Sequence, residues 1–84
     1  MYRLRVKRSA EADLRRLAGP LFERVNERIL ALRDEPRPPG TRRLSGAVEG
    51  WRIRVGDYRV VYQIDDTEQI VTMVRVRHRR EVYR

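Results

Sequence analysis

The sequence predicts an α+β fold of order β-α-α-β-β-β, in which two N-terminal helices pack on one face of a mainly antiparallel four-stranded sheet. Three observations predict it. Residues 2–7 alternate apolar and basic side chains, and residues 10–34 carry apolar side chains at helical spacing. Beyond a proline-rich segment, three short β-prone runs are separated by turn residues. A chain of 84 residues is expected to form one domain, residues 1–84.

The N-terminal half is expected to form one strand and two helices. Residues 2–7 form the strand, and Ser9 is a candidate N-cap for a short helix over residues 10–18. Gly19-Pro20 then separates this helix from a second one over residues 20–34, because Gly suits the position after a helix and Pro its first position. The side chains expected to face the core are Leu14 and Leu17 in the first helix and Leu21, Val25, Ile29 and Leu32 in the second.

The C-terminal half is expected to form an antiparallel meander. The proline-rich residues 35–40 end the second helix and connect it to strands over residues 51–55, 58–65 and 70–77. Gly56-Asp57 is a two-residue hairpin turn that needs a positive φ at Gly56.

The length of the turn near Asp65-Asp66-Thr67 decides which face the last strand presents. A three-residue loop places Arg75 opposite Arg59, whereas a loop of two or four residues reverses the faces. The three-residue loop is favoured because Ile70, Val74 and Val76 make the better core set.

One face of the predicted hairpin gathers arginines. Pairing around the turn places Arg54 opposite Arg59, with Arg52 on the same face, while the large apolar and aromatic side chains share the other face. The hairpin itself has no carboxylate on the arginine face. Like charges placed directly opposite each other destabilise a sheet. Such a face is poor for stability but well suited to bind an anionic ligand. The apolar face is expected to carry Trp51, Ile53, Val55, Tyr58, Val60, Tyr62 and Ile64.

The composition narrows the class of partner. The chain has 20 Lys and Arg against 12 Asp and Glu, a formal net charge of +8, and Lys7 is its only lysine. This excess of guanidinium groups favours a polyanionic or acidic partner. With no cysteine, one histidine and no metal-ligand spacing, no metal or other cofactor is expected. The alternating first residues predict neither a secretory signal nor a membrane contact, so the cytoplasm is the expected location.

The C-terminal segment adds further cations and an aromatic side chain. Tyr83 could stack on an RNA base or dock on the core, and His78 could carry a proton or simply lie on the surface. The basic side chains of this segment are Arg75, Arg77, Arg79 and Arg80.

These runs resemble the toxins of the RelE/ParE superfamily, and the resemblance covers essentially the whole chain. The residues that carry it are Leu44-Ser45-Gly46, the run Trp51-Arg52-Ile53-Arg54-Val55-Gly56-Asp57-Tyr58-Arg59-Val60-Val61-Tyr62, and the ending Val76-Arg77-His78-Arg79-Arg80-Glu81-Val82-Tyr83. The resemblance implies the toxin of a type II toxin–antitoxin system, a RelE-type, metal-independent endoribonuclease that cuts messenger RNA at the ribosome and inhibits translation under stress. It also implies an acidic antitoxin as partner, and contact with operator DNA only through the antitoxin complex.

The resemblance also implies the site. By position, the residues that serve cleavage are Arg52, Arg54, Arg59, Arg79 and Tyr83; His78 is a candidate for proton transfer; and Arg43, Arg75, Arg77 and Arg80 are candidates for RNA binding. Two departures matter. Arg stands at 52 and 54, where some relatives have Lys, and Arg is a far poorer base. Thr41-Arg42-Arg43 stands where relatives with a Glu–His pair have a carboxylate.

The implied reaction is attack of a ribose 2′-hydroxyl on the adjacent phosphate, which leaves a 2′,3′-cyclic phosphate and a 5′-hydroxyl end. Arg59 and Arg79 are expected to stabilise the phosphorane, Arg52 or Arg54 to position the phosphate, and His78 or Tyr83 to act as base. Two alternatives remain: a ParE-like inhibitor of DNA gyrase, and an RNA-binding module without catalysis.

Overall fold

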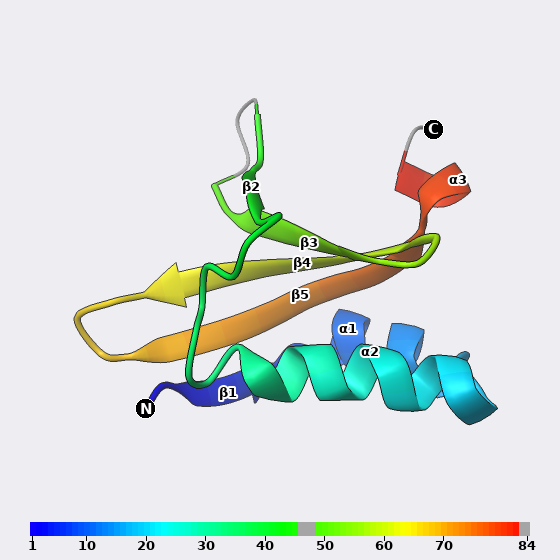
Figure 1. The fold of residues 1–84 in the computed structure, drawn as a ribbon, viewed down its shortest axis with the longest axis horizontal. Coiled ribbons are helices and arrows are strands. Elements are labelled where there is room, and N and C mark those ends of the chain that lie inside the picture. Colours follow the sequence, from blue (N-terminus) through cyan, green and yellow to red (C-terminus); the bar gives the residue numbers. More distant parts are fainter. Residues whose placement is uncertain (46–48, 83–84) are drawn as a thin grey trace.

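The computed structural model describes residues 1–45 and 49–82 and confirms the α+β class (Figure 1). Five strands form one sheet in the order β1-β5-β4-β3-β2, with β1 parallel to β5 and the other neighbours antiparallel. The elements are β1 (Arg3–Val6), α1 (Arg8–Arg15), α2 (Gly19–Ala31), β2 (Arg42–Arg43), β3 (Trp51–Val55), β4 (Tyr58–Asp65), β5 (Ile70–His78) and α3 (Arg79–Val82).

The sheet therefore has one strand more than predicted. Arg42 and Arg43 pair with Arg52 and Trp51, so the chain that follows the proline-rich segment adds a two-residue edge strand. A strand this short has no detectable alternation, which is why the sequence pattern does not predict it. The hairpin register is as predicted, with Arg54 opposite Arg59.

The helices differ from the prediction at their ends. The first helix begins at Arg8 with Lys7 as N-cap, and Ser9 is not its cap. The Ser9 hydroxyl instead donates to the Val74 carbonyl oxygen at 2.7 Å, on the strand edge beside the helix. The second helix begins at Gly19, whose φ is +55°, and ends at Ala31, three residues before the predicted end.

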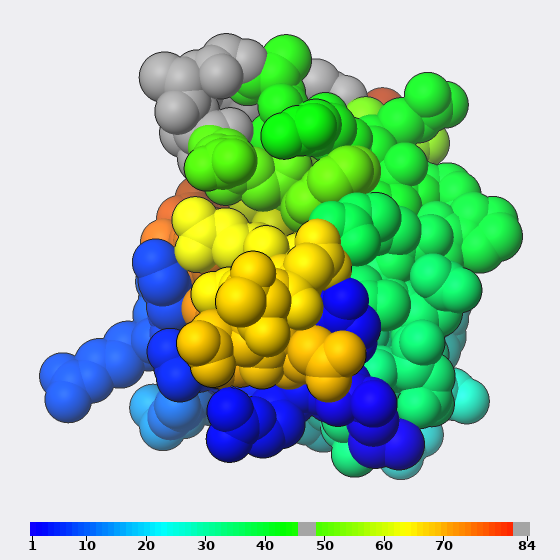
Figure 2. All heavy atoms as spheres, turned by 90° about the vertical axis from the view of Figure 1, so that its left-hand side faces the viewer, coloured from blue at the N-terminus to red at the C-terminus, as the bar shows by residue number. Residues whose placement is uncertain are grey.

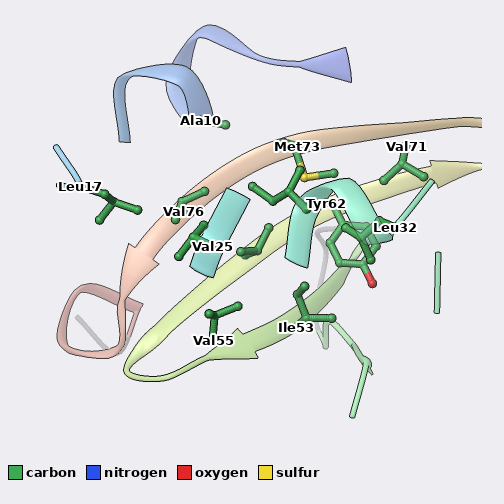
Figure 3. Close-up of a cluster of buried hydrophobic side chains, with 12 residues drawn as sticks. Ala10, Leu17, Val25, Leu32, Ile53, Val55, Tyr62, Val71, Met73 and Val76 are labelled. Carbon is green, nitrogen blue, oxygen red and sulfur yellow. The ribbon is translucent and has the colours of Figure 1, made fainter. Parts of the chain in front are cut away.

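The core lies between the helices α1 and α2 and the apolar face of the sheet, as predicted, with Ala10 of α1 fully buried in it (Figure 3). Val25, Ile29 and Leu32 at the helix join Ile53 and Tyr62 of the sheet in one buried cluster. The Tyr62 hydroxyl donates to the Pro36 carbonyl oxygen at 2.8 Å, which ties the proline-rich segment to the core. Burial raises the pKa of this hydroxyl.

The last strand corrects the predicted turn and core set. The turn between β4 and β5 has four residues, 66–69, rather than three, and a β-bulge at Val74 then shifts the register. Consequently Val71 and Met73 join Val76 in the core, while Ile70 and Val74 are only partly buried.

The bulge also decides which arginine opposes Arg59. Arg77, and not Arg75, lies opposite Arg59, and Arg75 lies opposite Val61. Because the bulge compensates for the longer turn, both arginines still share the face of Arg59. A bulge has no compositional signal in this run, so the sequence pattern cannot place it.

Gly50 packs closely against the sheet just before β3, and this close packing can be tested by a substitution. A Cβ at this position would lie 3.0 Å from the Tyr62 carbonyl oxygen and 3.2 Å from a Leu44 side-chain carbon. We expect Gly50→Ala to lower the free energy of unfolding by about 1–3 kcal/mol, measured by urea titration, because backbone cannot move aside. The exposed neighbour Ser45→Ala is the control. Equal midpoints for both variants would contradict the packing.

None of the helices within residues 1–45 and 49–82 has the length and apolar character needed to cross a membrane.

Candidate nucleic-acid interface

Two rows of side chains cross the face of the sheet opposite to the core. Directly opposed residues of antiparallel strands share a face, so the register itself places these side chains together. One row contains Arg54, Arg59 and Arg77. The second row contains Arg42, Arg52, Val61 and Arg75.

A pocket of about 190 Å³ lies where the first row meets the β3–β4 turn. Its lining residues are Arg54, Gly56, Asp57, Arg59 and Arg79. Gly56 has a φ of +60°, as predicted for this turn. A non-glycine residue would be strained in that conformation.

The three arginines of the pocket are held differently. Arg59 is only 6% exposed, whereas Arg54 and Arg79 are exposed. The backbone N–H of Arg79 donates to the Asp57 carbonyl oxygen at 2.7 Å, which docks the start of α3 on the hairpin turn. This bond brings a residue from the C-terminal segment into a pocket otherwise made by β3 and β4.

A buried carboxylate from α1 reaches the same face from outside the hairpin. Asp13 is 4% exposed, and its Oδ2 accepts hydrogen bonds from the Val76 backbone N–H at 2.9 Å and from Arg75 Nε at 3.0 Å. Its Oδ1 accepts a third hydrogen bond, from Arg75 Nη2 at 3.1 Å. β1 pairs with β5 only as far as Met73, so Asp13 satisfies an N–H on the open edge beyond it.

Arg77 lies between two carboxylates. Its Nε is 3.9 Å from Asp13 Oδ2 and 3.4 Å from Glu81 Oε2 of α3. Part of the cationic face is therefore neutralised within the protein, on the β5 side. The carboxylates that neutralise Arg75 and Arg77 on β5 do not pair with Arg54, which lies near the β3–β4 turn.

His78 does not lie on the arginine face. It is opposite Tyr58, and the two rings make an edge-to-face contact with centroids 5.2 Å apart. Tyr58 packs against the core cluster, so the imidazole is on the core side of the sheet. Its Nδ1 accepts the backbone N–H of Arg80 at 3.2 Å, which leaves Nε2 as the protonated nitrogen of the neutral ring.

Arg43 lies on the core side as well, at the far end of β3. Its guanidinium carbon is 5.4 Å from the centre of the Trp51 ring, and that of Arg37 is 4.9 Å from it. Arg37 also donates to Asp66 of the β4–β5 turn at 2.9 Å. This end of the molecule is thus separated from the pocket by the length of the strand.

The same end joins three distant segments, and Figure 2 shows the proline-rich segment and the N-terminal residues against the β4–β5 turn. Asp66 accepts hydrogen bonds from Arg37 and from the Tyr2 hydroxyl, the latter at 2.7 Å. Both bonds lower the pKa of Asp66, with that from Arg37 the larger cause. The bond to Asp66 in turn raises the pKa of Tyr2 and of Arg37.

The structure thus brings together three of the residues expected to serve cleavage: Arg54, Arg59 and Arg79. Arg52 lines a neighbouring hollow that shares Arg54. Tyr83 lies outside the described residues. Of the candidates for RNA binding, Arg80 is exposed on α3, and Arg75 and Arg77 are held by carboxylates.

Three residues of this face were missed by sequence reasoning. Arg42, rather than Arg43, shares the face of Arg52, because it pairs directly with it. Asp13 comes from a helix, and no local sequence pattern predicts that its carboxylate binds the edge of β5. Asp57 is predictable as a turn residue, but its place in the pocket follows from the structure, because Arg79 of α3 completes the lining.

Chemically, the pocket can bind and polarise a phosphodiester. Guanidinium groups match phosphate oxygens in charge and geometry, and a cation held in place before the ligand arrives costs little reorganisation. Among the residues that the structure describes, no group of three or more His, Asp or Glu is arranged to hold a metal ion.

Comparisons with known proteins identify the family and the fold. The family model of the ParE toxin of type II toxin–antitoxin system, parDE, matches residues 4–83. Toxin RelG of Mycobacterium tuberculosis (strain ATCC 25618 / H37Rv) is 34% identical over 87 residues, which cover 99% of this chain and 97% of that protein.

Two solved structures have the same fold. The toxin–antitoxin complex RelBE2 of Mycobacterium tuberculosis contains a chain with 30% identity and a TM-score of 0.81, covering 92% of this chain and 96% of that chain. A chain of the archaeal RelE–RelB complex from Pyrococcus horikoshii OT3 has 25% identity and the same TM-score of 0.81, covering 93% and 94%. The protein therefore belongs to the RelE/ParE family, the toxins of type II toxin–antitoxin systems.

Proposed function

We propose that this toxin is an endoribonuclease that cuts messenger RNA on the ribosome, without a metal ion, and so inhibits translation in the cytoplasm. The observation that carries the proposal is the pocket in which Arg54, Arg59 and Arg79 converge beside a tight turn. Three cations around one pocket suit a single phosphodiester.

In this proposal the ribose 2′-oxygen attacks the adjacent phosphorus while the bond from phosphorus to the 5′-oxygen breaks. The 5′-oxygen leaves with the electron pair of that bond. Arg59, being buried and fixed, stabilises the negative charge that develops on the phosphorane. The exposed Arg54 and Arg79 hold the scissile phosphate, and Arg42 and Arg52, around the adjoining hollow, bind the RNA strand beside it.

The partner proposed for control is an acidic antitoxin. Two features support it: the net charge of +8, and large apolar side chains that are exposed, among them Phe22 and Leu30 of α2 and Val6 of β1. An acidic segment that folds on this surface could cover both at once. The RelBE2 relative was itself solved as a toxin–antitoxin complex.

Inhibition of DNA gyrase is the second candidate, because the matching family model is that of the ParE toxin. The two functions differ in what is damaged. A gyrase inhibitor stops supercoiling and leaves RNA intact, whereas a nuclease produces new RNA ends.

Mapping of RNA 5′ ends after induction, with translation running and with translation blocked, tests the proposal beside a gyrase supercoiling assay. We expect new ends inside coding sequences, only while translation runs, and unchanged supercoiling. Unchanged RNA together with inhibited supercoiling would assign the toxin to the gyrase group.

A further inference from the structure

The turn that forms the guanidinium pocket also places a carboxylate in it. Asp57 is a lining residue of the pocket, together with Arg54, Arg59 and Arg79. Its side chain is 68% exposed, and its Oδ1 is 3.9 Å from Arg79 Nη1. At that distance the two groups attract each other without a hydrogen bond.

The other carboxylates on this face are engaged differently. Asp13 is buried and accepts three hydrogen bonds, so its oxygens have little capacity left. Glu81 lies 3.4 Å from Arg77, on the β5 side. By contrast, the carboxylate oxygens of Asp57 accept no hydrogen bond from residues 1–45 or 49–82, so their lone pairs are open to a ligand.

Asp57 lies in the same pocket as the three arginines that are proposed to bind the phosphodiester, whereas His78 lies on the core side of the sheet. Among the residues that the structure describes, the charged groups that line the pocket with Asp57 are cations: Arg54 on β3, Arg59 on β4 and Arg79 on α3. From α2, Arg24 Nη2 comes within 3.7 Å of the position that a Cβ on Gly56 would take. Asp57 is therefore the one carboxylate among the described residues that line this pocket.

We propose that Asp57 is the general base of the cleavage reaction, an inference that rests on the proposed function. Its carboxylate accepts the proton of the ribose 2′-hydroxyl as the bond from the 2′-oxygen to phosphorus forms. The 5′-oxygen leaves as an alkoxide beside the guanidinium groups. The proton then passes from Asp57 through water to that oxygen, which regenerates the carboxylate and gives the 5′-hydroxyl end.

The test is the pH dependence of single-turnover cleavage of ribosome-bound mRNA by Asp57→Asn. Asn suits a turn, and the backbone carbonyl that docks Arg79 is kept. We expect the rate at pH 7 to fall by about 10²-fold, the usual effect of losing a general base. Without a base the variant depends on hydroxide, so its rate should rise about tenfold per pH unit between pH 6.5 and 8.5, while the wild-type rate stays flat.

This slope separates a base from a residue that only positions Arg79, because a positioning defect lowers the rate without changing its pH dependence. Asp57→Glu, which keeps the carboxylate, should recover part of the rate with a flat profile. Glu68→Gln, an exposed carboxylate in the distant β4–β5 turn, is the matched control and should behave as the wild type.

The outcomes distinguish this inference from the proposed function. If the wild-type protein cleaves and Asp57→Asn is slow with a flat profile, or is as fast as the wild type, Asp57 is not the base and the nuclease function stands. If the wild-type protein makes no cut, the function itself fails, and the base with it.

Discussion

Arg59→Ala is expected to slow single-turnover cleavage of ribosome-bound mRNA by about 10²–10³-fold, the effect of removing one fixed group that stabilises charge in a transition state. Arg59 is 6% exposed, and it lines the pocket together with two exposed arginines. Because it is held in place before RNA arrives, no other cation of the pocket can replace it. The measurement is the rate at saturating toxin.

The control for this prediction is Arg5→Ala, an exposed arginine on β1, which should cleave at the wild-type rate. Urea unfolding of both variants separates a loss of catalysis from a loss of fold. Arg59→Lys should recover only part of the rate, because an ammonium group lacks the planar fork of donors. A folded Arg59→Ala variant that cleaves as fast as Arg5→Ala would show that the pocket is not the site of reaction.

The largest expected effect on stability is that of Asp13→Ala. The substitution leaves the buried Val76 N–H without its acceptor and Arg75 without its counter-ion on a face rich in arginine. Loss of one partner of a buried ion pair costs about 3–5 kcal/mol, and the 35% exposure of the Arg75 side chain reduces this to about 2–4 kcal/mol. Urea titration measures it.

Glu11→Ala on the same helix is the matched control. Glu11 pairs with Arg15 one turn away, but both side chains are exposed, at 52% and 75%. Exposed pairs of this kind contribute about 0.3–0.5 kcal/mol. If Asp13→Ala shifted the unfolding midpoint no more than Glu11→Ala, the carboxylate would not be the support of the β5 edge that we describe.

Much of this fold could be predicted because strong local patterns determine it. The hairpin at Gly56 follows from one glycine between two alternating strands, and the register places Arg54 opposite Arg59 without any tertiary information. The apolar stripe of α2 similarly predicts that Val25, Ile29 and Leu32 lie in the core.

What could not be predicted depends on contacts between distant segments. Asp13 and Val76 are 63 residues apart, and Ser9 donates to β5 rather than to its own helix. The longer turn and the extra residue at Val74 each shift the register by one residue, so Arg77 instead of Arg75 lies opposite Arg59 and both arginines keep the predicted face. No pattern in the sequence reports such a compensation.

The candidate site shows the same division. The pairing of Arg54 with Arg59 is local and predictable, whereas the position of Arg79 depends on the register of β5 against β4 and on the backbone hydrogen bond to Asp57. The opposite faces of Arg42 and Arg43 follow from a two-residue strand that only the structure defines.

The central claim is that the guanidinium pocket at the β3–β4 turn cleaves RNA by transesterification, and the chemistry of the product ends tests it most directly. Purified toxin is mixed in excess with ribosomes that carry end-labelled mRNA, and the two fragments are characterised. We predict a 2′,3′-cyclic phosphate on the upstream fragment, a 5′-hydroxyl on the downstream fragment, and no cut in a message with a 2′-deoxynucleotide at the scissile position. Fragments that begin with a 5′-phosphate, or cleavage of the 2′-deoxy message, would contradict it.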